Sequence, residues 1–567
     1  MDNIKYNVAK EIAAVLEQDT ETVLASIEKP KMSNMGDFAY PCFRLAATFK
    51  KAPPVIAGEI KDKLGDIEGV SKVEVVAGYI NFFADSTKVT ETVVKDILQA
   101  GDACYNLDEG TNKTICIDYS SPNIAKPFHI GHLRSTVIGA ALVKIYKALG
   151  YNVVGINHLG DFGTQFGYVI EGYKRFGKDY DLTEEPIKKL VEIYVKINEM
   201  AKDDEEIVNA ARRNFALLEA GDAETVALWQ RFRELSLEEY KKIYDILGIT
   251  FDSYNGEAFY NDKMDEIVDI LKEKDKLVES EGAKVVELET EKVPCMILKT
   301  NGSTTYATRD LAAILYRART YDYTKCLYLT GYEQILHFKQ IFETAKYIVE
   351  DKYVGGLMHV PFGMVLGPGG KKLSTRKGAS TTIKDVIDEA VEKAYQVLEA
   401  KGKTGEEAEK IAASVGIGAV IFNDLKNNRI KDEIFDLDEM LKFEGETGPY
   451  VQYTYVRTNS IMKKAGMEIN LDNIDFSILT AKEEIELVKL LANRKNIVKE
   501  AARDNEPSIL TRYIIDVASS FSKYYNECQI IVDDEKLKLA RLALVKATGY
   551  VLKNGLNMLG INAPEKM

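Results

Sequence analysis

Residues 120 to 132 have the sequence Ser120-Ser121-Pro122-Asn123-Ile124-Ala125-Lys126-Pro127-Phe128-His129-Ile130-Gly131-His132. A short apolar run at 115–117, typical of a strand, precedes this stretch, and a segment at 133–149 with the apolar periodicity of a helix follows it. A loop between a strand and a helix presents unpaired backbone N–H groups and the positive end of the helix dipole, which suit phosphate. The sequence therefore predicts a nucleotide-binding site here.

The histidines of this stretch are a paired feature. His129 and His132 would add hydrogen-bond donors, and Gly131 has no side chain, so a flat nucleotide base could lie close to the backbone. The chain has only five histidines, which makes chance a poor explanation for this pattern.

The composition is that of a soluble globular protein, with 567 residues, 46% hydrophobic and 29% charged. This length predicts about three to four domains. No apolar stretch approaches the roughly 20 residues that span a bilayer, and the first 20 residues lack the apolar core of a signal peptide, so we expect a cytoplasmic protein with no membrane partner. The net charge of -14 means that any nucleic-acid partner must meet local basic patches.

The pattern along the chain predicts four parts. Residues 1–110 form a small appended domain of amphipathic helices and short strands, at 73–77 and 80–83. Residues 111–390 show the strand, loop and helix alternation of a parallel sheet, with a charged helical insertion at about 170–247, after which the pattern resumes at 285–298. Residues 391–440 are a helical connection, and 441–567 are predicted to be all helical.

A second candidate element is the basic segment Lys371-Lys372-Leu373-Ser374-Thr375-Arg376-Lys377-Gly378, which follows a glycine-rich run. Its cations could neutralise the charge on a leaving pyrophosphate. Taken alone, such a segment is more often an exposed hairpin tip. Together with the paired histidines, it predicts that the two elements hold opposite ends of a triphosphate.

Several motifs resemble those of one family. The segment 129–132 resembles the HIGH signature of class I aminoacyl-tRNA synthetases, and 372–376 resembles their KMSKS loop. The long form at 120–132, the Leu-Gly-Asp block at 159–167 and the Tyr-Ala-Thr-Arg-Asp run at 306–310 are similar to motifs of arginyl-tRNA synthetases. The resemblance covers the whole chain. It implies a Rossmann-type α/β catalytic domain with helical insertions, between a small α+β domain and an all-α anticodon-binding domain.

The resemblance implies a two-step reaction. The arginine carboxylate attacks the α-phosphate of ATP, which Mg²⁺ accompanies, to give arginyl-adenylate and pyrophosphate. The terminal ribose of tRNA then takes the arginyl group. No protein nucleophile and no tightly bound cofactor are needed, because positioning and charge stabilisation would carry the rate.

The resemblance assigns this chemistry to residues of both elements. His129, Gly131, His132 and Lys372 would bind ATP. The catalytic set it implies is His129, His132, Lys126, Lys372, Ser374, Arg376 and Lys377.

The basic segment departs from the family signature, because Thr375 replaces its second lysine. Arginine is a wide planar donor and lysine a compact charge, so Arg376 is no simple substitute. Arginyl enzymes commonly carry a lysine three residues ahead of the first signature histidine. Lys126 stands there and is a candidate to compensate, and the sequence leaves open whether Lys126, Lys372 or Lys377 dominates.

An arginine substrate requires carboxylates and hydrogen-bond acceptors around its guanidinium, and the candidates are Glu257, Tyr306 and Asp310. The resemblance implies that these three line the side-chain pocket. It also implies that the α-amino and carboxylate end of the substrate meets Ser121, Asn123, His132 and Gln334. Without the resemblance, Glu257 would be one of 88 acidic residues and best explained as a surface residue.

The last third holds the candidates for contact with tRNA. Lys495 and Lys499 share a helix face that could meet the RNA backbone, although a solvated face explains them equally well. Tyr450 and Arg457 could stack on bases and pair with phosphate, and core packing is the competing explanation. The resemblance implies that Tyr525 and Met567 meet the anticodon loop.

The remaining histidines, His158, His337 and His359, are predicted to be structural, and Trp229 to lie in the core. The six scattered cysteines have no metal-ligand spacing and are expected to be buried and reduced.

Three other functions fit parts of the sequence. Another class I synthetase, such as a cysteinyl enzyme, would need a zinc-thiolate pocket. A small-molecule adenylyl or cytidylyl transferase would not need the helical last third. A noncatalytic RNA-binding paralogue predicts a damaged site. We expect instead a monomer that charges the tRNA for arginine and needs that tRNA before it activates the amino acid.

Overall fold

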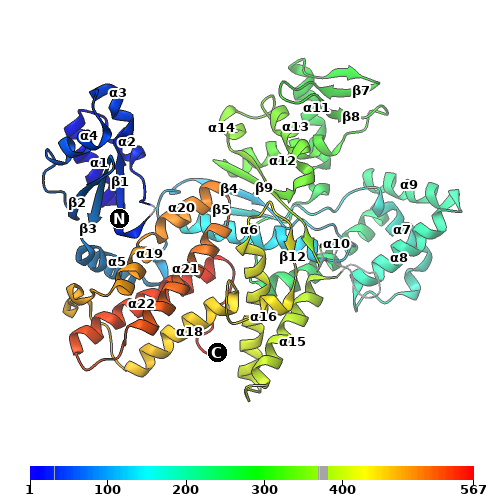
Figure 1. The fold of residues 1–567 in the computed structure, drawn as a ribbon. Coiled ribbons are helices and arrows are strands. Elements are labelled where there is room, and N and C mark those ends of the chain that lie inside the picture. The colour runs from blue at the N-terminus through cyan, green and yellow to red at the C-terminus, as the bar shows by residue number, and fades with distance from the viewer. Residues whose placement is uncertain (31, 368–369, 371–380) are drawn as a thin grey trace. The chain divides into compact units, whose positions relative to one another are not determined.

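A computed structural model describes the chain except for residues 31, 368–369 and 371–380 (Figure 1). The chain folds into two compact units. The first comprises Met1–Tyr105, Thr454–Ile497 and Tyr513–Asn554, and the second comprises Asn106–Tyr453, Val498–Arg512 and Gly555–Met567. Both units therefore contain segments that are far apart in the sequence.

The first unit begins with a small α+β domain. An antiparallel sheet in the order β1-β3-β2 is built from β1 (Phe38–Pro41), β2 (Val70–Val76) and β3 (Tyr79–Ala84). Its main helices are α1 (Asp2–Leu16), α2 (Thr20–Ser26), α4 (Pro53–Lys61) and α5 (Ser86–Ala100). Val8, Ile12 and Phe82 are fully buried in its core. The strands β2 and β3 confirm the two strands predicted at 73–77 and 80–83.

The last third is helical, as predicted. Its long helices are α18 (Gly448–Ala465), α19 (Lys482–Ala492), α20 (Arg494–Asp504), α21 (Ser508–Glu527) and α22 (Glu535–Met558). Leu487, Val517 and Leu544 have no exposed surface, which shows that these helices bury apolar faces. The boundaries between the two units fall inside α18, α20, α21 and α22, so each of these helices has residues in both units.

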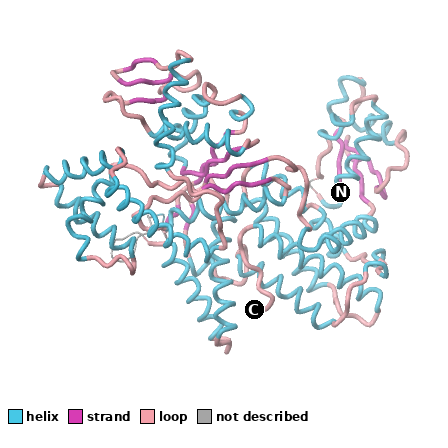
Figure 2. The backbone as a smooth tube through the Cα atoms, turned by 180° about the vertical axis from the view of Figure 1, so that it is seen from behind, coloured by secondary structure: helices cyan, strands magenta, loops and turns pink. Residues whose placement is uncertain are grey.

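The second unit is built on a parallel sheet in the order β10-β9-β4-β5, whose strands lie among helices in Figure 2. The strands are β4 (Thr114–Asp118), β5 (Asn152–Ile156), β9 (Lys325–Gly331) and β10 (Leu357–Phe362). The helix α6 (Ile130–Ala148) joins β4 to β5, and α13 (Ile335–Ala345) follows β9. The connection after β4 leads to β5 at one edge of the sheet, and the connection after β9 leads to β10 at the other edge. In such a sheet, ligands usually bind in the crevice between the carboxyl ends of the two central strands, here β4 and β9.

The predicted insertion is confirmed as helical. It contains α7 (Gln165–Phe176), α8 (Pro186–Ala201), α9 (Glu205–Glu219) and α10 (Ala223–Leu247). Phe166, Ile170, Leu190 and Phe232 are fully buried and give the insertion its own apolar core.

The prediction that the parallel pattern resumes at 285–298 is wrong. After α11 (Met264–Glu273), the strands β6 (Val278–Ser280), β7 (Ala283–Val286) and β8 (Cys295–Leu298) form a separate antiparallel sheet. A tight turn with positive φ at Glu281 and Gly282 reverses the chain between β6 and β7. Short apolar runs do not specify the direction of their partner, and the parallel sheet resumes only at β9, after α12 (Tyr306–Tyr321).

A helical connection follows the sheet. It contains α15 (Ile383–Glu399), α16 (Glu406–Lys426) and α17 (Leu437–Met440), and β11 (Val365–Leu366) pairs in parallel with β12 (Glu433–Ile434). The predicted boundary at residue 390 falls inside α15, and the domain limits stay predictions.

All six cysteines are buried and free. Among the residues that the structure describes, none of the helices combines the length and apolar character that crossing a membrane requires.

Candidate active site

The paired histidines lie at the start of α6. His129 is the N-cap of this helix, and its Nδ1 accepts a hydrogen bond of 3.1 Å from the backbone N–H of Gly131. The rings of His129 and His132 lie with centroids 3.9 Å apart. Because Nδ1 of His129 is an acceptor, the proton of the neutral ring stands on Nε2, which can donate to a ligand.

Both histidines are held neutral. Burial, with the charge of His129, lowers the pKa of His132 to about 3, and burial followed by the charge of Lys126 lowers the pKa of His129. The buried Nδ1 of His132 has no hydrogen-bond partner among the described residues. At neutral pH the pair therefore offers hydrogen bonds and no positive charge.

The loop before α6 has a strained backbone that the inserted helix α10 supports. Ser120, Ser121 and Ala125 have φ values of 70°, 45° and 55°, in the left-handed region that non-glycine residues rarely adopt. The Tyr240 hydroxyl donates to the carbonyl oxygens of Asn123 and Lys126, at 2.7 and 2.8 Å. The surrounding structure thus holds the loop in its unusual conformation.

One glycine of the 159–167 block lies against this loop. A Cβ atom on Gly160 would stand 2.0 Å from Oδ1 of Asn123 and 3.3 Å from its Cα, so the Asn123 side chain would have to move and the backbone contact would be tight. The backbone of Gly160 accepts from Ile124 and donates to Pro122. The close approach of the two segments explains why the position carries glycine.

A cavity of about 350 Å³ adjoins the histidines. It is lined by the start of α6 with His129 and Gly131, by Gly331 at the end of β9 and Glu333 just after it, and by residues 362–366, which run from the end of β10 through β11. The cavity therefore lies at the carboxyl ends of the parallel strands, as a nucleotide site of this fold requires.

The structure brings together the predicted carboxylates of the arginine pocket. Glu257 is at the start of a short helical turn, Glu257–Lys263, and Asp310 lies one turn after Tyr306 on α12. Burial raises the pKa of Glu257 to about 7; the guanidinium of Arg309 opposes that rise, and the charge of Asp310 adds to it. Arg309 NH1 lies 3.8 Å from Glu257 Oε2.

Three residues outside the predicted set hold Glu257 in place. Asp161 accepts a hydrogen bond of 2.8 Å from the backbone of Ala258 and one of 2.9 Å from Arg233 Nε. The indole of Trp229 donates to the carbonyl of Asp161 at 2.7 Å. Trp229 is only partly buried, and this hydrogen bond gives it a role beyond filling the core. The position of Asp161 in the 159–167 block could have identified it from the sequence as a residue of the site. Nothing in the sequence pointed to Trp229 or Arg233.

His337 contacts Asp310, one of the residues predicted to bind arginine. Its Nε2 lies 2.6 Å from Oδ2 of Asp310, and His337 follows Gln334 by one helical turn. The prediction of a merely structural histidine therefore missed a partner of a candidate binding residue. The spacing from Gln334 was the one signal that could have found it.

The other predicted substrate contacts occupy the loop and the opposite side of the crevice. Ser121 Oγ donates to Asp118 Oδ1 at 2.9 Å, and Asp118 pairs with the buried Arg317. Asn123 and Gln334 are exposed on the two sides. His158 is half-buried. Its backbone N–H donates to Ser121 Oγ and its Nδ1 lies 3.4 Å from Arg317, contacts that agree with the predicted structural hydrogen bond.

Lys126 is exposed beside the histidines, and its charge acts on the pKa of both. The predicted catalytic residues of the basic segment, three cations and one serine, lie outside the described residues. These are Lys372, Ser374, Arg376 and Lys377.

The candidate tRNA contacts are dispersed. Lys495 pairs with Asp96 at 3.2 Å and Lys499 with Glu109 at 2.6 Å, so each lysine meets a carboxylate of the chain itself. Tyr525 is 42% exposed, and the guanidinium of Arg457 lies 5.1 Å from its ring centroid.

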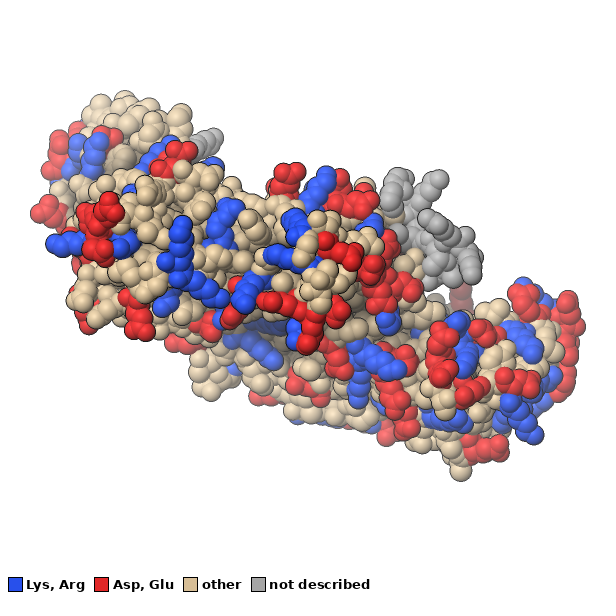
Figure 3. Space-filling view, turned by 90° about the horizontal axis from the view of Figure 1, so that it is seen from below, with Lys and Arg blue, Asp and Glu red and all other residues tan. Residues whose placement is uncertain are grey.

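Two further candidates are partly buried. Tyr450 is half-buried at the start of α18, and Met567 packs against the apolar cluster between α15 and α16. On the face drawn in Figure 3, Lys and Arg alternate with Asp and Glu among the described residues, which agrees with the negative net charge.

A parallel nucleotide-binding sheet with this histidine pair at its first crossover, followed by a helical C-terminal region, defines a class I aminoacyl-tRNA synthetase. Three family models match the chain: "tRNA synthetases class I (R), catalytic domain" at residues 93–437, "DALR anticodon binding domain" at 451–567, and "Arginyl tRNA synthetase N terminal domain" at 2–84. The chain belongs to the arginyl-tRNA synthetase family.

Individual relatives agree with this placement. The chain is 48% identical to the arginine–tRNA ligase of Clostridium botulinum over 99% of its own length and 100% of that protein, and 45% identical to that of Alkaliphilus metalliredigens over the whole of both chains. Among solved structures, it is similar to arginyl-tRNA synthetase of Plasmodium falciparum, with a TM-score of 0.82, 25% identity and 99% coverage of both chains. The Thermus thermophilus arginyl-tRNA synthetase has the same fold, with a TM-score of 0.83 at 23% identity and 99% coverage of both chains.

Proposed function

We propose that the protein joins L-arginine to its cognate tRNA through an arginyl-adenylate. The observation that carries this proposal is that Glu257 and Asp310 lie close enough for the charge of Asp310 to raise the pKa of Glu257, in the unit that also holds the paired neutral histidines. Family membership supports arginine aminoacylation of tRNA and the use of ATP.

In the first step the arginine carboxylate attacks the α-phosphate of ATP and pyrophosphate leaves. His129 and His132, each neutral, would donate hydrogen bonds to phosphate oxygens as negative charge shifts onto the leaving group. Lys126, with the lysines and arginine of the basic segment, would supply the positive charge that neutral imidazoles lack. Mg²⁺ enters as the metal of the nucleotide substrate.

In the second step a terminal ribose hydroxyl of tRNA attacks the activated carbonyl, forms the ester and releases AMP. The adenylate supplies the leaving group, so this step needs correct placement of the two substrates more than a protein nucleophile. Tyr525 and Arg457 are the proposed contacts to the anticodon region, since an exposed aromatic ring beside a guanidinium suits an unstacked base.

The arginine side chain would enter beside Glu257 and Asp310. Arg309 NH1 lies 3.8 Å from Glu257 Oε2, and the guanidinium of the substrate would add charged hydrogen-bond donors to this carboxylate. Asp310 would give the second charged contact. Ser121, Asn123, His132 and Gln334 would meet the α-amino and carboxylate end, as the family pattern implies.

The test is arginine-dependent exchange of pyrophosphate into ATP, run with and without total tRNA. We expect exchange with tRNA present and little without it. Exchange with another amino acid in place of arginine would contradict the substrate. Absence of exchange under both conditions would favour the noncatalytic RNA-binding paralogue.

Family membership conflicts with two competing functions, because neither a synthetase for another amino acid nor a small-molecule transferase fits the three matched models. The proposal also includes a monomeric state and a cytoplasmic location. Gel filtration with light scattering would test the first, because a dimer would elute with twice the mass of 63.5 kDa.

A further inference from the structure

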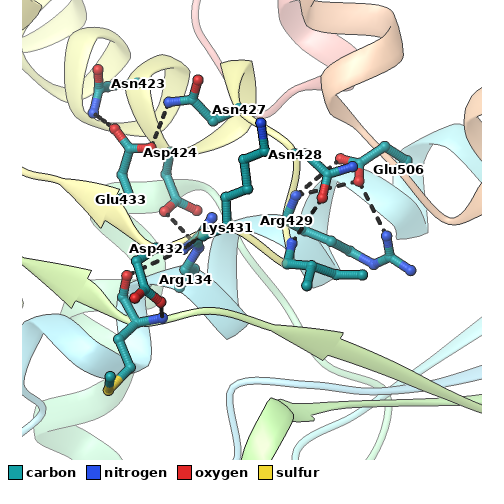
Figure 4. Close-up of polar contacts among 12 residues, drawn as sticks. Arg134, Asn423, Asp424, Asn427, Asn428, Arg429, Lys431, Asp432, Glu433 and Glu506 are labelled. Atoms are coloured by element: carbon teal, nitrogen blue, oxygen red, sulfur yellow. Dashed lines mark hydrogen bonds and ion pairs between the residues drawn. The ribbon is translucent and has the colours of Figure 1, made fainter.

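Arg134 is a buried cation that the proposed reaction does not use. It lies two residues after His132 on α6 and has no exposed surface. Its NH1 donates to the carbonyl of Lys431 at 2.6 Å and to that of Met364 at 3.3 Å. Its Nε lies 3.3 Å from Oδ1 of Asp424 on α16 (Figure 4). One guanidinium thus joins the histidine helix to segments more than 200 residues away, since Met364 is 230 positions further along the chain.

Both backbone polar groups of Met364, its N–H and its carbonyl, form hydrogen bonds. Its N–H donates to Oδ1 of Asp432 at 2.8 Å, and its carbonyl accepts from the N–H of Glu433 at 2.8 Å as well as from Arg134. These bonds fix the register in which β11 pairs with β12. The backbone just before β11 is therefore clamped from two directions.

The clamped segment is a wall of the candidate nucleotide cavity. Gly363, Met364, Val365 and Leu366 line that cavity together with His129 and Gly131. Arg134 sits on the same helix as the histidines and bonds to the same residue that Asp432 holds. The distance across the cavity therefore depends on Arg134.

Stability alone does not account for this choice of residue. Buried ion networks are often no more stable than apolar side chains of the same size. Asp424 and Glu433 are both buried near Arg134, and Glu433 accepts hydrogen bonds from Asn423 and Asn427. What a guanidinium adds is a rigid set of donors that bonds two carbonyl oxygens in a fixed direction.

We propose that Arg134 is a positioning residue for ATP, because it holds residues 363–366 at a set distance from the histidines and so maintains the width of the nucleotide cavity. This inference rests on the proposed function. It predicts an effect on ATP that exceeds the effect on arginine, since Glu257 and Asp310, the carboxylates proposed for the arginine side chain, lie on elements other than α6.

The test uses Arg134→Lys and Asp432→Ala with Arg429→Met as the matched control. Asp432 is exposed, so its replacement removes the bond to Met364 at little cost in packing. Arg429 forms a partly buried ion pair of 3.1 Å with Glu506 in the same segment, and none of its described side-chain contacts reaches β11. Arginine-dependent pyrophosphate exchange with tRNA present gives the KM of each substrate and kcat, and thermal unfolding gives Tm.

We expect Arg134→Lys to raise the ATP KM at least about tenfold and the arginine KM less than about threefold, because one charged hydrogen-bond donor is lost from Met364. Asp432→Ala should raise the ATP KM by about three- to tenfold with Tm unchanged. Arg429→Met should lower Tm and leave the ratio of the two KM values as in the wild type.

The positioning role is overturned if Arg134→Lys and Asp432→Ala both keep the wild-type ATP KM, or if Arg429→Met shifts it equally. Failure of the wild-type protein to exchange pyrophosphate would instead overturn the proposed function. Because Asp432→Ala perturbs Met364 from the solvent side, the test does not depend on the folding of Arg134 variants.

Discussion

At the scale of single residues, burial sets the protonation of the candidate site. The same physical cause lowers the pKa of His129 and His132 and raises the pKa of Glu257, because burial disfavours whichever form carries charge. The histidines are thereby neutral donors, and Glu257 titrates near neutral pH. A cationic substrate would restore the charged form of this carboxylate.

We therefore expect Glu257 to make arginine binding pH-dependent. In the free protein its pKa is raised to about 7, so below that pH the carboxyl is protonated and arginine must displace a proton. We expect the arginine KM to rise about tenfold for each pH unit below 7 and to level off above it. Steady-state exchange between pH 6 and 8.5 would measure this.

The matched variant for this prediction is Glu257→Gln, which keeps the shape and removes the titration. It should show a high arginine KM that does not change with pH in this range. A Gln variant with the wild-type pH profile would assign the titration to another group.

His337 is expected to position Asp310 for the substrate guanidinium. His337→Ala removes the 2.6 Å contact to Asp310, and we predict a rise of about tenfold in the arginine KM with the ATP KM within twofold of the wild type. His359→Ala is the control, since His359 meets only Thr330 Oγ1 among its side-chain hydrogen bonds in the described residues. Equal effects of both variants on arginine would reject a specific role for His337.

At the scale of elements, the helical insertion braces the site. From α10, Tyr240 holds the loop carbonyls at Asn123 and Lys126, Ser236 accepts from the N–H of Ala125, and Arg233 holds Asp161. These contacts come from one face of one helix. The insertion thus supports both the strained loop of the histidine motif and the turn that carries Glu257.

Tyr240→Phe tests this support. The variant keeps the buried ring and loses the hydroxyl that both carbonyls share, so the strained loop loses about 1 kcal/mol of restraint. We expect kcat/KM for exchange to fall at least fivefold with a small fall in Tm. Tyr105→Phe is the control, because that buried hydroxyl also donates to a backbone oxygen, that of Val551, and both residues belong to the first unit.

The contrast between the two tyrosines decides the outcome. Both variants should lose similar stability, and only Tyr240→Phe should lose activity. Equal losses of activity would mean that the insertion stabilises the fold without shaping the loop.

At the scale of the whole molecule, the chain's last third contributes to the catalytic unit. The Tyr146 hydroxyl on α6 donates to the carbonyl of Ala502 at 2.8 Å, and Gln452 donates to the carbonyls of Ser414 and Asn562. Removal of all residues beyond 440 would therefore cut into the unit that holds the parallel sheet. Point variants are the better test of tRNA recognition.

Tyr525→Ala is expected to raise the KM for tRNA in aminoacylation by about ten- to a hundredfold, because a stacked base is worth about 1–3 kcal/mol. The KM values for ATP and arginine should stay within twofold. Tyr525→Phe keeps the ring and should retain the wild-type KM for tRNA. An unchanged KM for tRNA in the Ala variant would remove Tyr525 from the interface.

The sequence by itself determined the strand, loop and helix that carry the paired histidines, the helical insertion and the helical last third. Each of these depends on contiguous residues, because a strand, a loop with His129 and His132, and a helix form one local unit, and long periodic segments specify helices. The arginine pocket needed the family resemblance, since Glu257 and Asp310 are isolated carboxylates in the sequence.

Only the tertiary structure decided which residues support those that the sequence identified. Trp229 and Arg233 lie 68 and 72 positions from Asp161, and Arg134 lies 230 positions from Met364, so no local pattern records these contacts. The wrong prediction of parallel strands at 285–298 has the same cause, because a short apolar run does not encode the direction of the strand with which it pairs. Hydrogen bonds between distant segments are set by how the whole chain packs, and that packing places the supports around the site.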